Sequence, residues 1–199
     1  STYQGLVTQI GRGTVVTLSA DSSNVVAAIS AGMTAATVTQ IEDAKGGEGN
    51  DTLKGNDVAN VLTGNNGNDI FIGRGGDDII NGGAGVDTAV FSGVYVDYLI
   101  KISGVTITIT DNNLLDGNDG KEILTGVEVL QFLNATINLT TSTFEGSTGI
   151  DTFTALNNNN WTLNGLAAND SLKGRNGNDI INGNDGNDTL NGKAGDDDL

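Results

Sequence analysis

The chain has 199 residues, which suits one or two domains, and its formal net charge is −16 at pH 7. Such an acidic chain is a poor partner for nucleic acid or for an anionic membrane surface. The sequence contains no His, Cys or Pro, which excludes a zinc or thiol site, a disulfide framework and self-cleavage at an Asp-Pro bond.

Residues 1–45 are rich in Thr, Val and Ala and lack any repeat spacing. Thr14–Ser19 and Thr37–Ile41 are predicted strands. The segment 25–33 between them fits a short helix or a further pair of strands, and its periodicity does not decide between the two. We expect residues 1–45 to form an N-terminal β cap over the first rung of the repeats that follow.

Residues 46–90 hold five nine-residue units, which read GGEGNDTLK, GNDVANVLT, GNNGNDIFI, GRGGDDIIN and GGAGVDTAV. Most of them carry Gly at the first and fourth places, Asp at the sixth and an apolar residue at the eighth. Gly permits the positive φ angles that a tight turn needs. The last three residues of each unit predict a short parallel strand whose eighth-place side chain points inward. Asn60 replaces the Asp of the second unit, so we expect a weaker or empty site there.

Residues 91–145 interrupt the period and are expected to form an intervening β segment. Tyr98–Ile102 and Val105–Ile109 alternate apolar and polar residues around Ser103-Gly104, which predicts an antiparallel hairpin. A polar loop, DNNLLDGNDG, follows at 111–120. Asp116 and Asp119 imitate part of a calcium loop, but an ordinary hydrophilic turn is the better interpretation.

Residues 146–199 return to the nine-residue period, with the intact units GRNGNDIIN and GNDGNDTLN and a final GKAGDDDL. The earlier run STGIDTFT places Asp151 at the sixth place and Phe153 at the eighth. Trp161 is either a platform for stacking sugars or an apolar plug over the first rung, and the plug is favoured. The chain opens without Met and Leu199 falls inside a unit, so we expect a fragment of a longer protein.

Hard Ca²⁺ takes six to eight oxygen ligands, which one Asp per turn does not supply, so a site must be shared between stacked turns. If successive turns lie on opposite edges, turns on one edge are eighteen residues apart. The predicted columns are Asp51 with Asp69 and Asp87, Asn60 with Asp78, Asp170 with Asp188, and Asp179 with Asp197. The predicted inward residues are Leu53, Leu62, Phe71, Ile80, Leu172, Ile181 and Leu190. A disordered linker of this composition would have no reason to keep an aliphatic residue two places after each Asp.

These units resemble the calcium-binding nonapeptide repeats of the repeats-in-toxin (RTX, hemolysin-type) family. The resemblance covers 46–90 and 146–199, and a weaker one at 119–132 has Glu122 where the family usually has Asp, which puts a ligand role for Glu122 in doubt. It implies two parallel β-rolls, the second truncated at its C-terminal end, with 91–145 between them. The implied ligands of several Ca²⁺ ions are sixth-place side chains and carbonyls of the glycine turns. The sixth-place side chains are Asp51, Asn60, Asp69, Asp78, Asp87, Asp170, Asp179, Asp188 and Asp197. The turn glycines are Gly46, Gly47, Gly49, Gly64, Gly67, Gly73, Gly76, Gly82, Gly85, Gly174, Gly177, Gly183, Gly186, Gly192 and Gly195.

The resemblance also implies a secreted bacterial protein, exported by a type I secretion apparatus, that folds when it meets calcium outside the cell. No apolar run approaches the ~18 residues of a membrane span. With neither His nor Cys, we predict that these residues are not an enzyme. Two alternatives stay open: an adhesive or surface-layer segment that binds glycan or neighbouring copies, or the accessory part of a secreted enzyme. Trp161, Tyr95 and Tyr98 gathered on one open face would favour adhesion.

Overall fold

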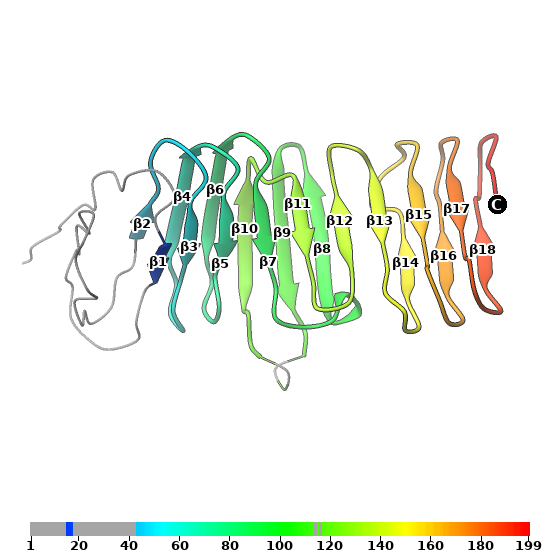
Figure 1. The fold of residues 1–199 in the computed structure, drawn as a ribbon, viewed down its shortest axis with the longest axis horizontal. Coiled ribbons are helices and arrows are strands. Elements are labelled where there is room, and N and C mark those ends of the chain that lie inside the picture. Colours follow the sequence, from blue (N-terminus) through cyan, green and yellow to red (C-terminus); the bar gives the residue numbers. More distant parts are fainter. Residues whose placement is uncertain (1–14, 18–42, 114, 116) are drawn as a thin grey trace, which may run out of the picture. The chain divides into compact units, whose positions relative to one another are not determined.

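The computed structural model describes residues 15–17, 43–113, 115 and 117–199 (Figure 1). Its secondary structure is almost wholly β, with one 3₁₀ turn at Tyr95–Asp97 among the described residues. Two compact units are formed, one by Ser1–Gly93 with Tyr98–Val127 and the other by Val94–Asp97 with Glu128–Leu199. No helix in the described ranges is long and apolar enough to cross a membrane. The predicted all-β class is confirmed.

The first unit is a parallel β-roll made of two sheets. One sheet has the strand order β1 (Val15–Thr17), β3 (Thr52–Lys54), β5 (Ile70–Ile72) and β7 (Thr88–Val90). The other has the order β2 (Asp43–Lys45), β4 (Val61–Asn66), β6 (Ile79–Ala84), β10 (Lys121–Thr125), β9 (Thr106–Asp111) and β8 (Tyr98–Ser103). Neighbours are parallel up to β10, whereas β10, β9 and β8 pair antiparallel. The β8–β9 pair confirms the predicted hairpin.

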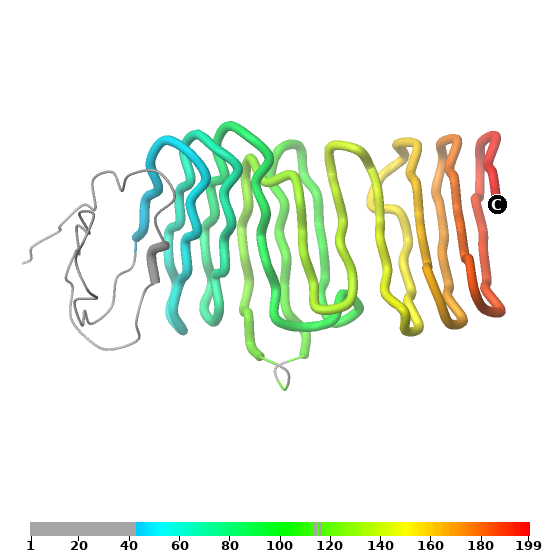
Figure 2. The backbone as a smooth tube through the Cα atoms, viewed as in Figure 1, coloured from blue at the N-terminus to red at the C-terminus, as the bar shows by residue number. Residues whose placement is uncertain are grey.

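The nine-residue period explains the roll directly. Each unit contributes a glycine turn and one short strand, and consecutive strands alternate between the two sheets, so units eighteen residues apart stack on one another (Figure 2). Leu53 therefore lies in register with Phe71, and Leu62 with Ile80. All four side chains are at most 1% exposed, because the middle residue of each strand points between the sheets.

The second unit repeats this plan after an antiparallel start. One sheet has the order β11 (Val129–Gln131), β12 (Thr136–Asn138), β13 (Thr143–Glu145), β15 (Thr162–Asn164) and β17 (Ile180–Asn182). The other has the order β14 (Thr152–Thr154), β16 (Ser171–Lys173) and β18 (Thr189–Asn191). Strands β11 to β13 are antiparallel, and the remaining pairs are parallel. Leu172 and Ile181 are buried as predicted, whereas Leu190 in the edge strand β18 is half-buried.

Aromatic side chains fill the first coils of the second unit. Phe144 and Phe153 stack with ring centroids 4.1 Å apart, and Trp161 packs against Phe153 at 5.6 Å. Trp161 is 1% exposed, and its indole Nε1–H donates to Asn157 Oδ1 at 3.0 Å. This satisfies the one polar atom of the ring without exposing its face. The plug interpretation is confirmed, and the sugar-stacking interpretation is wrong.

Within residues 1–45 the structure describes two strands, β1 and β2, and β2 pairs parallel with β4 of the roll. Strand β1 lies within the predicted Thr14–Ser19 and pairs parallel with β3. The predicted strand Thr37–Ile41 and the undecided segment 25–33 lie outside the described residues.

Candidate metal centre

The sixth-place Asp side chains form ladders along the edges of each roll. In the first unit the Asp51 N–H donates to Asp69 Oδ1, and the Asp69 N–H donates to Asp87 Oδ1, both at 2.8 Å. On the opposite edge the Asn60 N–H donates to Asp78 Oδ1 at 2.8 Å. Each donor and acceptor are eighteen residues apart, so the predicted columns of the first unit are confirmed.

The second unit has the same ladders. The Asp170 N–H donates to Asp188 Oδ1 at 2.9 Å, and the Asp179 N–H donates to Asp197 Oδ1 at 3.0 Å. Asp151, which the predicted ligand set omits, joins the first of these columns by donating its N–H to Asp170 Oδ1 at 2.9 Å. Its separation from Asp170 is nineteen residues because one extra residue lies in the intervening turn. Trp161 takes the sixth place above Asp179 and donates its backbone N–H to Asp179 Oδ1.

The second carboxylate oxygen distinguishes two kinds of turn. Where the second-place residue is Gly47 or Ser147, its N–H donates to Oδ2 of Asp51 or Asp151 in the same unit. The Oδ2 atoms of three other Asp residues are buried and have no hydrogen-bond partner. These residues are Asp69, Asp78 and Asp170. Their second-place residues, Asn65, Arg74 and Leu166, have φ values of 79°, 70° and 78°.

The first-place glycines leave room for an oxygen pocket beside these atoms. A Cβ added at Gly64 would lie 2.1 Å from Asp69 Oδ2 and 2.5 Å from the carbonyl oxygen of Gly82 in the next coil of the column. At Gly174 the corresponding distances are 2.0 Å to Asp179 Oδ2 and 2.6 Å to the Gly192 oxygen. A carboxylate oxygen and a carbonyl oxygen of the neighbouring coil therefore converge beside the Cα of each of these two glycines. Any side chain at that place would fill the space between the coils.

The electrostatics of these turns are unfavourable without a cation. Desolvation raises the pKa of Asp69 and, with the nearby charges of Asp151 and Asp188, that of Asp170. Burial is also the main reason that the pKa of Asp78 rises to about 6. A buried carboxylate with an unpaired oxygen is costly unless a positive charge compensates it.

This donor set fits a hard cation. It contains only oxygen atoms, its carboxylates have unused acceptors, and glycine carbonyls converge on them. In the described residues no three Asp, Glu, His or Cys side chains gather into one cluster. An ion bound here must therefore draw on backbone carbonyls and on more than one coil, as the sequence leads us to expect.

The comparison with protein families agrees with this chemistry. The model of the RTX calcium-binding nonapeptide repeat matches in four copies, over residues 41–57, 54–89 and 164–199. The chain carries RTX calcium-binding repeats. Such repeats are structural calcium-binding elements, and they occur in secreted bacterial proteins. The turns described above belong to the matched segments, apart from those of Asp151 and Trp161.

The other two comparisons add little to function. No curated protein matches the sequence of this chain. Among solved structures, the chain is similar to the extracellular lipase LipA from Serratia marcescens, with 21% identity and a TM-score of 0.44. The similarity covers 77% of this chain and 29% of the lipase chain, so the chain spans less than a third of that protein's length.

The RTX turns contain a second ladder that the sequence analysis missed. Asn50 Oδ1 accepts the N–H of Asn68 at 2.9 Å, and Asn68 Oδ1 accepts the N–H of Val86 at 2.9 Å. In the second unit Asn160 and Asn178 make the same contact. Asn recurs at the fifth place of the units, next to the Asp, and this repetition was the available signal. These amides fix the spacing of the coils on which the Asp columns depend.

The degenerate RTX unit around Asn60 keeps the turn but not the charge. Asn60 Oδ1 accepts the N–H of Asn56 at 2.8 Å, so its amide oxygen makes the contact that a carboxylate makes at Asp51. Val58 stands at the fourth place, where the other units of this roll have Gly. The weaker or empty site at Asn60 stays a prediction.

Asp119 differs from its predicted role. It is 6% exposed, and its carboxylate accepts hydrogen bonds from the Ser92 N–H, the Ser92 hydroxyl and the Tyr98 hydroxyl. The expectation of an ordinary hydrophilic turn is therefore wrong for Asp119, which ties the loop to the start of the hairpin. Asp116 lies outside the described residues.

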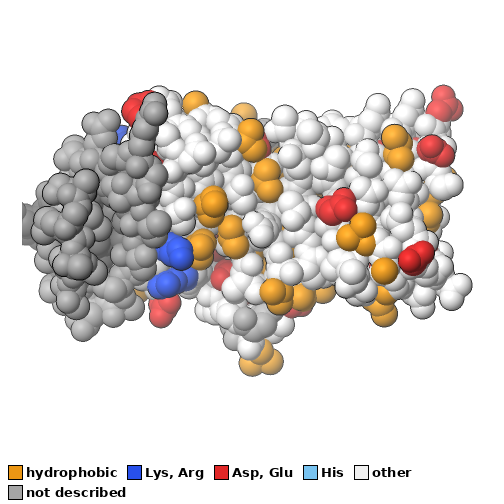
Figure 3. Space-filling model, viewed as in Figure 1, with side chains coloured by type: hydrophobic (Ala, Val, Ile, Leu, Met, Phe, Trp, Pro, Cys, Tyr) orange, Lys and Arg blue, Asp and Glu red, His pale blue; other side chains and the backbone are white. Residues whose placement is uncertain are grey.

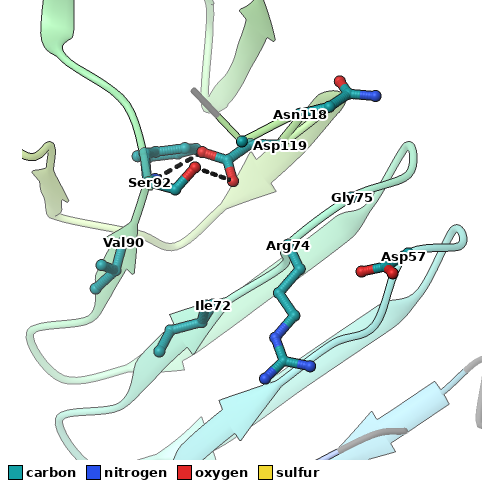
Figure 4. Close-up of a pocket in the computed structure, with 10 residues that line it drawn as sticks. Asp57, Ile72, Arg74, Gly75, Val90, Ser92, Asn118 and Asp119 are labelled. Carbon is teal, nitrogen blue, oxygen red and sulfur yellow. Dashed lines mark hydrogen bonds between the residues drawn. The ribbon is translucent and has the colours of Figure 1, made fainter. Parts of the chain in front are cut away.

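A cavity of about 400 Å³ opens beside this loop (Figure 4). Ile72, Val90 and Phe91 give it an apolar wall, while Asp57 and Arg74 are at its rim and exposed to solvent. Its one hydroxyl nucleophile, Ser92, donates to Asp119, whose two oxygens are already shared among three donors. The carboxylate that contacts this hydroxyl is therefore already engaged in other hydrogen bonds.

The aromatic residues named for adhesion do not form an open face. Trp161 and Tyr98 are buried, and Tyr95 is half-buried against Phe132 at a centroid distance of 5.5 Å. The face seen in Figure 3 carries only small, separate groups of apolar side chains. The condition that would favour adhesion is therefore not met by these residues.

Proposed function

We propose that this chain is a calcium-ion-binding RTX module of a secreted bacterial protein, which folds into β-rolls on binding Ca²⁺ after export. Residues 46–90 and 146–199 would be the two calcium rolls, 1–45 the N-terminal cap and 91–145 the intervening segment. The observation that carries the proposal is the set of buried, unpartnered Oδ2 atoms of Asp69, Asp78 and Asp170. At Asp69 and Asp170 the carbonyl oxygen of a glycine in a neighbouring coil lies close to the same place, which is the oxygen environment that Ca²⁺ prefers.

The proposed ligands are the sixth-place side chains and the carbonyls of the glycine turns predicted from the sequence, with Asp151 added. Several ions would be bound along the columns. Each ion would neutralise carboxylates that otherwise face one another without compensation and would bridge coils eighteen residues apart. Asn60 would contribute an uncharged oxygen and hold its ion weakly or not at all.

The energy balance of one unit explains why calcium would control folding. A unit buries one main apolar side chain, worth about 1.5–3 kcal/mol. Ordering the nine residues of the unit costs more backbone entropy than this burial returns, and ladder hydrogen bonds offset only part of the difference. Binding to the folded state alone adds about 2.7 kcal/mol for an ion at a hundredfold excess over its Kd.

The affinity range of such sites would make folding respond to the difference in calcium concentration between the inside and the outside of the cell. Extracellular calcium modules bind with Kd values of about 10⁻⁴–10⁻³ M. At micromolar calcium the rolls would stay open, which suits passage through a type I secretion apparatus. At millimolar calcium outside the cell they would close. The module would then stabilise or present whatever is attached to it.

Isothermal titration calorimetry of the full chain with Ca²⁺ and with Mg²⁺ tests the proposed binding. We expect several Ca²⁺ ions to bind and Mg²⁺ to give little heat, because Mg²⁺ demands a near-ideal octahedron and loses water reluctantly. Equal heats for the two ions would count against a site built from bent carbonyls and shared carboxylates.

A further inference from the structure

The segment 117–126 stacks on the first roll as an additional coil. Ile123 and Leu124 of β10 lie in parallel register with Ile79 and Ile80 of β6. The Ile123 N–H donates to the Asp78 carbonyl at 2.8 Å, just as the Ile79 N–H donates to the Asn60 carbonyl at 2.8 Å in the coil before. The offset along the chain is 44 residues instead of eighteen, because the β8–β9 hairpin is inserted between the two coils.

The backbone of this segment makes the same close approaches as a repeat turn. Gly120 has φ +82°, and a Cβ on it would lie 1.8 Å from the Gly76 carbonyl oxygen. A Cβ on the fourth-place Gly85 would meet the Gly67 oxygen in the same way, at 2.0 Å. Gly120 therefore stands at the fourth place. The segment reads GNDGKEILT, with Gly at the first and fourth places, an acid at the sixth and Leu at the eighth.

The sixth place of this coil is Glu122, which lies above Asp78. Glu122 is 1% exposed, and its Oε2 has no hydrogen-bond partner. Asp78 is fully buried and also has an unpartnered oxygen, Oδ2. The charges of two other carboxylates also raise the pKa of Glu122, but both carboxylates already accept hydrogen bonds. Asp119 accepts them from Ser92 and Tyr98. Asp111 accepts them from the N–H groups of Asn113 and Asp119.

We propose that Glu122 and Asp78, with carbonyls of their turns, hold a further divalent cation between two coils that are 44 residues apart in the chain. The segment lies outside the matched RTX repeats, and the donor chemistry is the same, so Ca²⁺ is the expected ion. This inference rests on the proposed calcium-dependent folding. The ion would link β10, which follows the inserted hairpin, to β6 of the roll. It would thereby offset the entropic cost of closing the long loop between the two strands.

The competing explanation is a protonated Glu122 that needs no ion. Burial, together with the charges of Asp119 and Asp78, raises the pKa of Glu122 to about 9, so the free protein would keep this side chain neutral near pH 7. Gln is a close copy of the neutral form but supplies no charge to a cation. Glu122→Gln therefore separates the two explanations.

The experiment counts bound calcium by calorimetry in the full chain and in its Glu122→Gln variant, with Asp77→Asn as the matched control. Asp77 is an exposed neighbour of Asp78, so its change should leave the number of ions unaltered. We expect Glu122→Gln to bind one ion fewer, or to bind that ion at least tenfold more weakly. Calcium-dependent protection of the β8–β10 amides from hydrogen exchange should be lost with it.

Three outcomes separate the possibilities. An unchanged ion count and unchanged exchange protection in Glu122→Gln would overturn this inference while leaving the proposed function intact. Failure of the unaltered chain to bind calcium would overturn the proposed function itself. If Glu122→Gln loses the fold of the first unit, Glu122→Asp decides the question: retained ion count supports the site, and equal loss in both variants contradicts it.

Discussion

Asp69→Asn should have opposite consequences with and without calcium. Asp69 is fully buried, its Oδ1 accepts the Asp51 N–H at 2.8 Å, and its Oδ2 has no partner. Asn keeps the size of the side chain and the Oδ1 acceptor, so the ladder contact survives. The change removes the charge and replaces the unpartnered Oδ2 with an NH2 group, which cannot ligate a cation. Asn60 already occupies the equivalent place on the other edge and shows that an amide fits the turn.

The expected magnitude follows from what each state loses. In chelator the variant loses a buried charge whose desolvation raises the pKa of Asp69, so residual structure should be unchanged or slightly greater. In calcium it loses a charged ligand. Interactions with charged groups contribute about 1.5–3 kcal/mol against about 1 kcal/mol for neutral ones. A difference near 1.4 kcal/mol corresponds to about a tenfold higher calcium midpoint.

The assay is a calcium titration followed by far-ultraviolet circular dichroism, run on the unaltered chain, on Asp69→Asn and on the exposed control Asp77→Asn. Only Asp69→Asn should shift the midpoint. A midpoint equal to that of the unaltered chain would refute the ligand role of Asp69. Loss of structure in chelator would refute the argument that its charge is uncompensated.

Three further predictions concern the columns, the glycines and pH. Asp188→Ala should raise the calcium midpoint of the second unit, whereas Asn60→Ala should hardly change that of the first; similar shifts in calorimetry would contradict the column assignment. Gly64→Ala should weaken calcium binding by tenfold or more, because the methyl group would occupy the space between Asp69 Oδ2 and the next coil; unchanged binding would show that this space holds no ion. In chelator the β signal should increase as pH falls from about 7 to about 5, because burial raises the pKa of Asp78 from 3.8 to about 6 and the folded state then binds the proton more tightly. The stability that protonated Asp78 contributes is fully present below the pKa of the unfolded state and is lost as pH rises through about 6. A β signal that falls on acidification over this range would contradict the prediction.

The regular part of the molecule could be predicted because it obeys one period. Gly, Asp and an aliphatic residue recur every nine places, and this spacing determines the turn, the column and the inward side chain together. Leu53 and Phe71 are buried and in register as expected. Leu190 is less buried than predicted because β18 is an edge strand with a single neighbour in its sheet.

The irregular part could not be predicted because it depends on contacts between distant segments. The hairpin is visible in the alternation of its residues, but nothing local shows that β10 returns to β6 after 44 residues. The burial of Asp119 depends on Ser92 and Tyr98, which precede it by 27 and 21 residues. The sequence contained the pattern around Glu122, yet Glu in place of Asp and the interrupted period hid the additional coil.

The central claim is that the RTX rolls are open without calcium and closed with it. Far-ultraviolet circular dichroism and the hydrodynamic radius of the full chain, measured in chelator and in millimolar Ca²⁺, test it directly. The account predicts a weak β signal and an expanded chain in chelator, and a strong β signal and a compact chain in calcium. An equal β signal in both conditions, with an unchanged hydrodynamic radius, would falsify the folding switch.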